Sequence, residues 1–331
     1  MAGSGRSGTS LFAGILARLG FHVPQPEVTA DVTNPRGFAE SKWVVDFHTV
    51  LLERAGVQVA DARPGAWALT ANVALDEHPR KELRTWLETQ FREADHIVIK
   101  DPRLSWFLPL WRRCAQEVGA APRFATVLRH PAAVVDSKQR SYGNWQSDVD
   151  RTAGWVNQSL YTERATREAP RVYVRYQDIL DDWTRTVSRV GEELGLSVIR
   201  DAPATSIVQV HEFVDRSLSR SRSSWEDFEI PGGLRTLADE VWALLSGLAE
   251  DDAVKELPVE ELEAARAAYV DLYEDAEAIA QSSIVAASRP ARHSPVVRAM
   301  KLVPKRYRRK VPLRWRVSVA RALNRSGVPT I

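Results

Sequence analysis

Two glycines near the start of the chain have the spacing of a phosphate-binding loop. Gly3 and Gly8 bracket four residues, and an amphipathic stretch over 11–19 follows at once. Such a loop directs backbone N–H groups and the N-terminus of the next helix toward an anion. The lysine that a nucleoside triphosphatase uses to reach the β- and γ-phosphates is replaced by Thr9, and a cation lies inside the loop at Arg6. We therefore expect a ligand with one compact anionic group over the loop and no γ-phosphate.

A second pair of residues has the types and spacing to hold a phosphate. Arg129 follows the apolar run 124–128, which has the pattern of a buried strand, and Ser137 lies about two turns into the helix predicted after it. In open α/β sheets, ligands bind beyond the carboxyl ends of the strands. A guanidinium and a hydroxyl at that edge can together bind phosphate oxygens.

Both segments resemble PAPS-dependent sulfotransferases of the bacterial type that modify carbohydrates and small molecules. Gly5-Arg6-Ser7-Gly8-Thr9-Ser10 is similar to the family's 5′-phosphosulfate loop, and 128–137 is similar to its 3′-phosphate motif. The resemblance implies 3′-phosphoadenosine-5′-phosphosulfate (PAPS) as co-substrate, and no metal. The donor-binding residues that it implies in these two segments are Gly5, Arg6, Ser7, Gly8, Thr9, Ser10, Arg129 and Ser137.

Two later segments extend the resemblance to about residue 225. The segment 173–180 is similar to a late strand and helix of the family, which implies that Tyr176 lies near the adenine. The segment 213–218 is similar to a loop that closes over the nucleotide. Arg216 is therefore a second candidate for the 3′-phosphate, the alternative being an exposed surface charge.

Glu40 is the candidate general base. It follows the turn 34–37 and precedes an apolar helix predicted over 43–52, and bacterial relatives often carry a similar block. A side chain that takes the proton of an acceptor hydroxyl contributes about 10²–10⁴-fold in rate. The alternative is that Glu40 caps this helix or pairs with Arg36 or Lys42.

A short cation-rich segment begins at Lys100. Cytosolic relatives carry a Lys-x-His motif near this point, with the His as base, and its absence here shifts the base role toward Glu40. By the same resemblance, Lys100 contacts the bridging or sulfuryl oxygens, and Arg6 joins Glu40 and Lys100 as a catalytic residue. Arg103 either contacts acceptor or phosphate, or pairs with Asp101.

The elements that must position these residues alternate along the chain. Strands are predicted over 96–100, 124–128 and 171–176, and helices between and after them over 80–92, 132–141, 149–166 and 183–194. Alternation of this kind predicts an α/β protein: a P-loop-like three-layer fold with a central parallel sheet and helices on both faces, plus a C-terminal helical extension. Because only two residues precede Gly3, the first strand is either unusually short or lies upstream of Met1.

Composition is that of a globular protein, with 44% apolar and 27% charged residues among 331. The single cysteine, Cys114, excludes an internal disulfide and argues against a cysteine-based metal site. Without a run of about 18 apolar residues or a secretory signal, we expect a cytoplasmic location. We expect a sulfotransferase domain over 1–287, with motifs in 3–225 and a helical part in 232–287, and a basic extension over 288–331.

The basic extension contains 13 Lys and Arg and no Asp or Glu, whereas acids outnumber bases in the rest of the chain. It is predicted to dock on the anionic inner face of a membrane, to fold back on the acidic body or to bind a polyanionic partner. Nucleic acid is not the expected partner.

The combined motifs predict transfer of a sulfuryl group to a hydroxyl of a carbohydrate, a lipid-linked glycan or a secondary metabolite. One alternative is a P-loop kinase of small molecules, which would use ATP and Mg²⁺; another is a non-catalytic nucleotide- or membrane-binding protein. Most of the tryptophans fall at helical positions, which favours packing in the core. The alternative for Trp106, Trp111 and Trp145 is the wall of the acceptor pocket, because aromatic rings stack on sugars.

Overall fold

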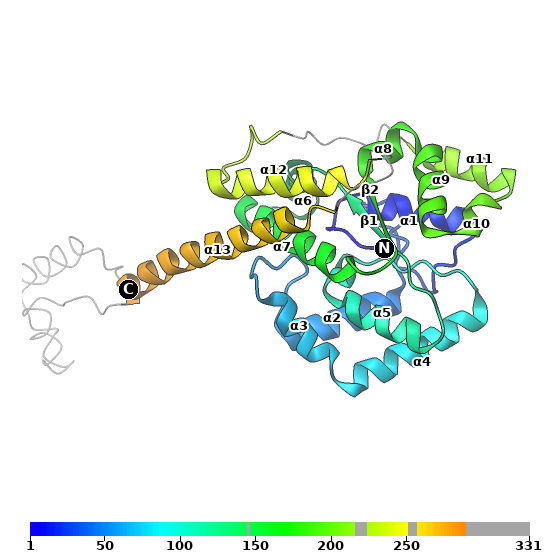
Figure 1. The fold of residues 1–331 in the computed structure, drawn as a ribbon, viewed down its shortest axis with the longest axis horizontal. Helices are drawn as coiled ribbons and strands as arrows, with labels where there is room; N and C mark the ends of the chain where they lie inside the picture. The colour runs from blue at the N-terminus through cyan, green and yellow to red at the C-terminus, as the bar shows by residue number, and fades with distance from the viewer. Residues whose placement is uncertain (144–145, 216–223, 251–256, 289–331) are drawn as a thin grey trace, which may run out of the picture. The chain divides into compact units, whose positions relative to one another are not determined.

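The computed structural model describes residues 1–143, 146–215, 224–250 and 257–288 (Figure 1). Two strands, β1 (Phe124–Leu128) and β2 (Arg171–Arg175), form a parallel two-stranded sheet in which Thr126 pairs with Tyr173. Both strands coincide with predicted ones. The described chain is thus a mixed α/β protein that is mostly helical, and its sheet is smaller than the sequence predicted.

Helices connect and surround the strands. In chain order they are α1 (Thr9–Arg18), α2 (Lys42–Ala55), α3 (Ala66–Ala74), α4 (Glu77–Glu93), the 3-10 helix η1 (Pro102–Phe107), α5 (Leu108–Glu117), α6 (Pro131–Tyr142), α7 (Asp148–Thr166), α8 (Tyr176–Asp181), α9 (Trp183–Leu194), α10 (Ser197–Arg200), α11 (Ala204–Phe213), α12 (Gly232–Gly247) and α13 (Val259–Ser288). The apolar periodicity correctly predicted α1, α4, α6, α7 and α9. None of the described helices is both long and apolar enough to cross a membrane.

The segment before the glycine loop pairs with β1 through one residue. The Ala2 N–H donates to Ala125 O at 2.9 Å, and the Ala2 carbonyl accepts from Val127 N–H at 3.0 Å. This is a parallel bridge between Ala2 and Thr126. It sets the start of the loop against the middle of β1.

The predicted strand 96–100 pairs with its neighbours at single residues and forms no hydrogen-bond ladder. Ile97 forms one parallel bridge to His22, and Ile99 O accepts a hydrogen bond of 2.7 Å from the Met1 amino group. The prediction of a regular strand here is wrong, because each neighbouring segment pairs with it at only one or two residues. These backbone bonds nevertheless fix the position of the segment, and Lys100 follows directly at its C-terminal end.

Different helices cover the two faces of the sheet. Val127 and Val174 pack in a core cluster with apolar residues of α1 and α9, whereas Leu128 and Tyr173 pack with residues of α6, α7 and α12. Successive side chains of a strand point to opposite faces, which explains why neighbouring residues belong to different clusters. A third cluster joins α2, α4, α5 and η1 to Phe124 at the start of β1.

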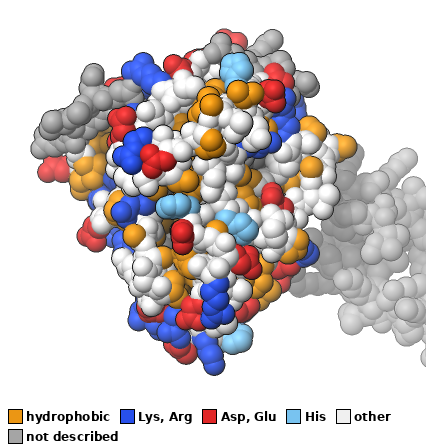
Figure 2. All heavy atoms as spheres, turned by 90° about the vertical axis from the view of Figure 1, so that its right-hand side faces the viewer, with side chains coloured by type: hydrophobic (Ala, Val, Ile, Leu, Met, Phe, Trp, Pro, Cys, Tyr) orange, Lys and Arg blue, Asp and Glu red, His pale blue; other side chains and the backbone are white. Residues whose placement is uncertain are grey.

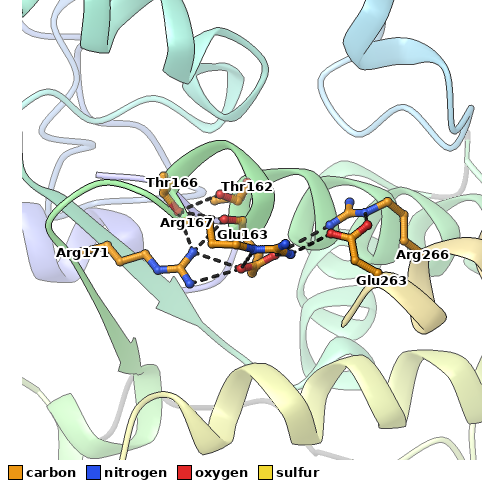
Figure 3. A network of polar contacts seen from close by, with 7 residues as sticks. All are labelled: Thr162, Glu163, Thr166, Arg167, Arg171, Glu263 and Arg266. Carbon is orange, nitrogen blue, oxygen red and sulfur yellow. Dashed lines mark hydrogen bonds and ion pairs between the residues drawn. The ribbon is translucent and has the colours of Figure 1, made fainter. Parts of the chain in front are cut away.

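A buried carboxylate links α7 to β2 and α13 (Figure 3). Glu163 of α7 is fully buried and accepts hydrogen bonds from Arg167 at 2.6 Å and from Arg171 of β2 at 3.1 Å. Arg266 of α13 lies 3.7 Å from the same carboxylate, and Glu263 contacts both Arg167 and Arg266. A buried carboxylate is tolerated only where such partners replace its hydration. The cluster therefore holds α7 in one position.

The chain divides into two units, Met1–Tyr273 and Glu274–Ile331. The described part of the second unit is the C-terminal stretch of α13. The predicted boundary at 287 stays a prediction, and residues 289–331 of the basic extension lie outside the described residues. On the face of the molecule in Figure 2, acidic and basic side chains are intermixed rather than gathered into one patch.

Candidate functional site

A cleft of about 1120 Å³ lies where the carboxyl ends of the strands meet the glycine loop. Arg129 enters it directly after β1, Tyr176 directly after β2, and Lys100 after the bridged segment 97–99. The predicted site residues that line it are Gly5, Arg6, Gly8, Thr9, Ser10, Glu40, Lys100, Arg103, Arg129, Ser137 and Tyr176. Ser7 is buried beneath the loop and is not part of this lining. Arg216 lies outside the described residues.

The backbone conformation of the glycine loop at position 8 requires glycine. This residue has φ of 95° and is the N-cap of α1, whose first turn has no side-chain cap. A Cβ at this position would lie 2.2 Å from the ring of Tyr176. Glycine therefore allows the ring to lie directly against the loop, at the end of α1 where backbone N–H groups point outward.

The two predicted phosphate motifs are in direct contact. Arg6 Nε donates a hydrogen bond of 3.1 Å to Ser137 Oγ, and Arg129 donates one of 3.0 Å to the carbonyl of Arg6. The guanidinium of Arg129 also lies 4.5 Å from the centre of the Tyr176 ring. Burial lowers the pKa of Arg129, which still leaves a cation at neutral pH. Two cations, a hydroxyl and an aromatic ring thus converge on one wall of the cleft.

Glu40 and Lys100 form a buried ion pair at the floor of the cleft. Lys100 Nζ contacts Glu40 Oε1 and donates a second hydrogen bond of 2.9 Å to Ser10 Oγ in the first turn of α1. The two residues are only 3% and 7% exposed. The alternative pairing of Glu40 with Arg36 or Lys42 is wrong.

Those two cations have other partners, and the N-cap of α2 is not Glu40. Arg36 pairs with Asp215 at 3.0 Å, and Lys42 pairs with Asp46 at 2.5 Å. Ser41 is the N-cap residue of α2. Glu40 is therefore directed inward, where its partner is a lysine 60 residues away in the chain.

Burial moves the proton affinities of the pair toward each other. It raises the pKa of Glu40 above its ordinary value, an effect that the charge of Lys100 opposes. It lowers the pKa of Lys100, an effect that Glu40 opposes. A carboxylate of raised pKa is a better proton acceptor than an exposed one, provided that the neighbouring ammonium keeps it ionised.

A buried network behind Lys100 was not found from the sequence. His48 Nδ1 lies 2.7 Å from Asp101 Oδ2, and Trp111 Nε1 donates to His48 Nε2 at 2.8 Å. Because His48 accepts from Trp111, its Nδ1 carries the proton that it donates to Asp101. The other carboxylate oxygen of Asp101 accepts from Arg103 at 2.8 Å, which confirms that pairing.

The network holds the backbone next to Lys100 in place, since His48 and Asp101 are almost completely buried. A signal for His48 was available: it lies on the apolar stripe of α2 with Val44 and Leu51. A polar residue on a buried stripe must find a buried partner.

Apolar side chains form another part of the cleft lining, the apolar wall. Leu52, Val57 and Val59, from the end of α2 and the loop after it, belong to it together with Phe38, although Glu53 and Gln58 of the same segment also line the cleft. Residues 32–37 continue this lining and are called the rim. Arg36 joins this rim to the segment after α11 through the carbonyl of Phe213 and the carboxylate of Asp215.

The tryptophans predicted for the acceptor wall lie elsewhere. Trp106 and Trp111 are 1% and 6% exposed and belong to the core of η1, α2 and α5, which confirms the core prediction and makes the pocket alternative wrong for both. They lie on the inner faces of their helices, where the whole ring is buried by packing. Trp145 lies outside the described residues.

The charge of the cleft suits an anionic ligand. Its lining cations are Arg6, Arg36, Lys100, Arg103, Arg129, Lys138 and Arg140, against the acids Glu40, Glu53 and Asp215. No group of three or more metal-ligating side chains occurs among the described residues. Comparisons of the chain with protein-family models, with curated proteins and with solved structures found no match.

Proposed function

We propose that this protein is a PAPS-dependent sulfotransferase that transfers a sulfuryl group to the hydroxyl of an acceptor molecule. The supporting observation is the meeting of three features in one cleft. The glycine loop touches Ser137 through Arg6, Arg129 is bonded to the loop, and the buried pair of Glu40 and Lys100 reaches the same loop through Ser10.

The proposal includes a P-loop-like three-layer fold. Backbone bonds link five segments in the order 21–23, 97–99, 1–3, 124–128 and 171–175. The pairings of His22 with Ile97, of Ala2 with Thr126 and of β1 with β2 are parallel. The glycine loop follows the middle segment, which has a bonded neighbour on either side, and this order supports the proposed fold. Helices α1 and α9 on one face and α6, α7 and α12 on the other would be the outer layers.

Donor binding is assigned to the cationic wall. The loop backbone at the N-terminus of α1 and the charge of Arg6 suit the 5′-phosphosulfate, and Arg129 with Ser137 suits the 3′-phosphate. Tyr176 offers a ring for the adenine. The glycine loop carries Arg6 and is bonded by Arg129 and, through Ser10, by Lys100, which suits a nucleotide that carries anionic groups at two positions.

The chemistry requires a base and a stabilised leaving group. Glu40 takes the proton of the acceptor hydroxyl while the new O–S bond forms, and the S–O bond to the phosphate breaks. The electron pair remains on the phosphate oxygen, where Lys100 and Arg6 meet the growing negative charge. Lys100 is suited to this because it already bonds both Glu40 and the loop residue Ser10.

The acceptor is assigned to the apolar wall. Leu52, Val57 and Val59 favour an acceptor with an apolar portion next to its reactive hydroxyl, such as a lipid-linked glycan or a secondary metabolite. A carbohydrate without such a portion is the remaining candidate.

Calorimetry with the product nucleotide tests the donor assignment. We expect 3′,5′-adenosine bisphosphate (PAP) to bind the intact protein without metal, and ATP with Mg²⁺ to bind far more weakly. Incubation with labelled PAPS and extracts of the native host should then yield a sulfated product that mass spectrometry identifies. Tight ATP binding without PAP binding would instead indicate the kinase alternative.

A further inference from the structure

A second cavity, much smaller than the cleft, lies beneath the glycine loop. Its volume is about 10 Å³, and it shares no lining residue with the cleft. Five of its lining residues carry hydroxyl groups: Ser4 and Ser7 of the loop, Thr126 of β1, and Ser159 and Thr162 of α7. All of them except Ser159 are buried. The cavity therefore brings hydroxyl groups together where the loop, β1 and α7 meet.

Two of these hydroxyl groups are buried without a hydrogen-bond partner among the described residues. They belong to Thr126 and Thr162, which are 5% and 1% exposed. Thr152 and Thr166, on the same helix as Thr162, instead donate to the carbonyl four residues earlier, each at 2.8 Å. A buried hydroxyl without a partner costs free energy in the folded state. The wall of the cavity thus carries polar groups that require a partner.

The two threonines reach the cavity from different elements. Thr126 lies on the same face of β1 as Leu128, which packs with residues of α7 and α12. Thr162 lies next to Glu163 on α7 (Figure 3), and both residues are buried. A small molecule between the two hydroxyl groups would therefore link the strand to the helix.

The size and the charge of the cavity suit one water molecule. A water site requires a volume of about 10–15 Å³, and a buried water makes about three hydrogen bonds. None of the described residues that line the cavity has an ionisable side chain. A bound ion would be a buried charge without a counter-charge, which is unfavourable. A neutral ligand of the smallest size is therefore the one that fits.

We propose that one water molecule binds in this cavity as a fixed part of the structure. It forms hydrogen bonds with the hydroxyl groups of Thr126 and Thr162 and with a hydroxyl group of the loop. Ser7 is the loop residue suited to this role, because it is 1% exposed and lines the cavity but not the cleft. Its backbone N–H donates to the Ser4 carbonyl at 3.1 Å, which leaves the side chain as its free polar group.

The water site supports the glycine loop from below. The loop is joined to β1 by the backbone bonds of Ala2, and the water adds a link to α7, which the cluster around Glu163 holds in place. Buried waters of this kind are costly to remove. The shape of the loop then depends on the hydroxyl groups beneath it as well as on its glycines.

A crystal structure of the intact protein, at a resolution that shows ordered water, tests the site directly. We expect a single density peak at about 2.7–3.2 Å from the hydroxyl oxygens of Thr126 and Thr162. A cavity without such a peak would overturn the proposal.

The variants Thr126→Val and Thr162→Val test the same site in solution, because valine keeps the shape of threonine and removes only the hydroxyl. Each variant takes a partner from the water, so we expect thermal unfolding about 2–4 °C below that of wild type. The double variant should lose less than the sum of the two shifts, since both side chains bind one water. Thr85→Val, on the exposed face of α4, is the matched control and should shift unfolding by about 1 °C or less.

A dry cavity predicts shifts of the opposite sign. Each valine would then remove an unpaired buried hydroxyl and raise the unfolding temperature, and that result in both variants would refute the water site. If a variant does not fold, the density in the wild-type crystal decides. Neither measurement uses a nucleotide, so the water site stands or falls independently of the proposed function.

Discussion

Glu40 and Lys100 combine two properties that exposed residues do not offer together. Each is buried, so that its charge interacts strongly with its partner, and each lies on the wall of an open cleft. An exposed pair would be screened by water and would hold no defined position. The burial of this pair, more than the identity of either residue, makes it a candidate for proton transfer.

Glu40→Gln tests the role of the carboxylate. Glutamine keeps the shape and a hydrogen bond to Lys100 but cannot take up a proton, so we expect sulfate transfer from PAPS to fall about 10²–10⁴-fold. Binding of PAP, measured by calorimetry, should persist. Glu88→Gln, an exposed residue of α4 outside the cleft lining, is the control and should retain activity within about twofold. Full turnover in E40Q would remove Glu40 from the mechanism.

Asp101→Asn tests the network behind Lys100. Burial opposes ionisation of Asp101, but the hydrogen bond from His48 and the charge of Arg103 outweigh it and hold the pKa of Asp101 below its ordinary value. Removing one partner of a buried charged network costs about 3–5 kcal/mol in the free energy of unfolding. We expect a loss of that size at pH 7 in urea denaturation.

The pH dependence of this loss has a defined sign. A carboxyl group with a depressed pKa in the folded state stabilises the protein above the unfolded value of about 4, and this contribution disappears as the pH falls through the lower folded value. The gap between wild type and D101N should therefore narrow below pH 4. Asp46→Asn, an exposed partner of Lys42, is the control and should cost about 1 kcal/mol or less. An unchanging gap would contradict the assignment.

At the scale of elements, the packing of α7 depends on the fully buried carboxylate of Glu163. Glu163→Gln leaves three arginines around a neutral amide, and we expect it to lower the free energy of unfolding by about 3–5 kcal/mol. Denaturation at neutral pH measures this loss. Glu263→Gln, at the partly exposed end of the same network, should cost about 1 kcal/mol. Equal losses in the two variants would show that burial of Glu163 is not the cause.

The helices were more predictable than the strands. Apolar spacing in α6, α7 and α9 is local information, since residues three and four apart meet on one face of a helix. Strand pairing depends on partners far along the chain. The segment 96–100 has the composition of a strand, yet among the described residues it pairs with His22 through two backbone hydrogen bonds and with Met1 through one.

At the scale of the whole chain, the basic extension is expected to govern membrane contact. Each Lys or Arg near an anionic bilayer contributes about 1 kcal/mol, and residues 288–331 contain 13 of them. Full-length protein should therefore float with anionic vesicles at low salt, and a chain that ends at 287 should not. Neutral vesicles and high salt are the controls, because screening weakens this attraction. Equal flotation of both chains would exclude a membrane role for the extension.

The sequence by itself determined which residue types could bind a phosphate, and where. Arg6 and Gly8, and the pair of Arg129 and Ser137, were recognisable because each set lies next to a predicted strand or helix whose end presents it. The two sets were expected in one site only through a family resemblance. Their direct contact, from Arg6 to Ser137, is a property of the folded chain.

Only the tertiary structure decided the partners and the burial of the charged groups. The sequence left Glu40 with Arg36 or Lys42 as partners, whereas packing brings it to Lys100. The physical reason is that hydration and ion pairing depend on atoms brought together from distant segments, while helical periodicity depends on neighbours along the chain.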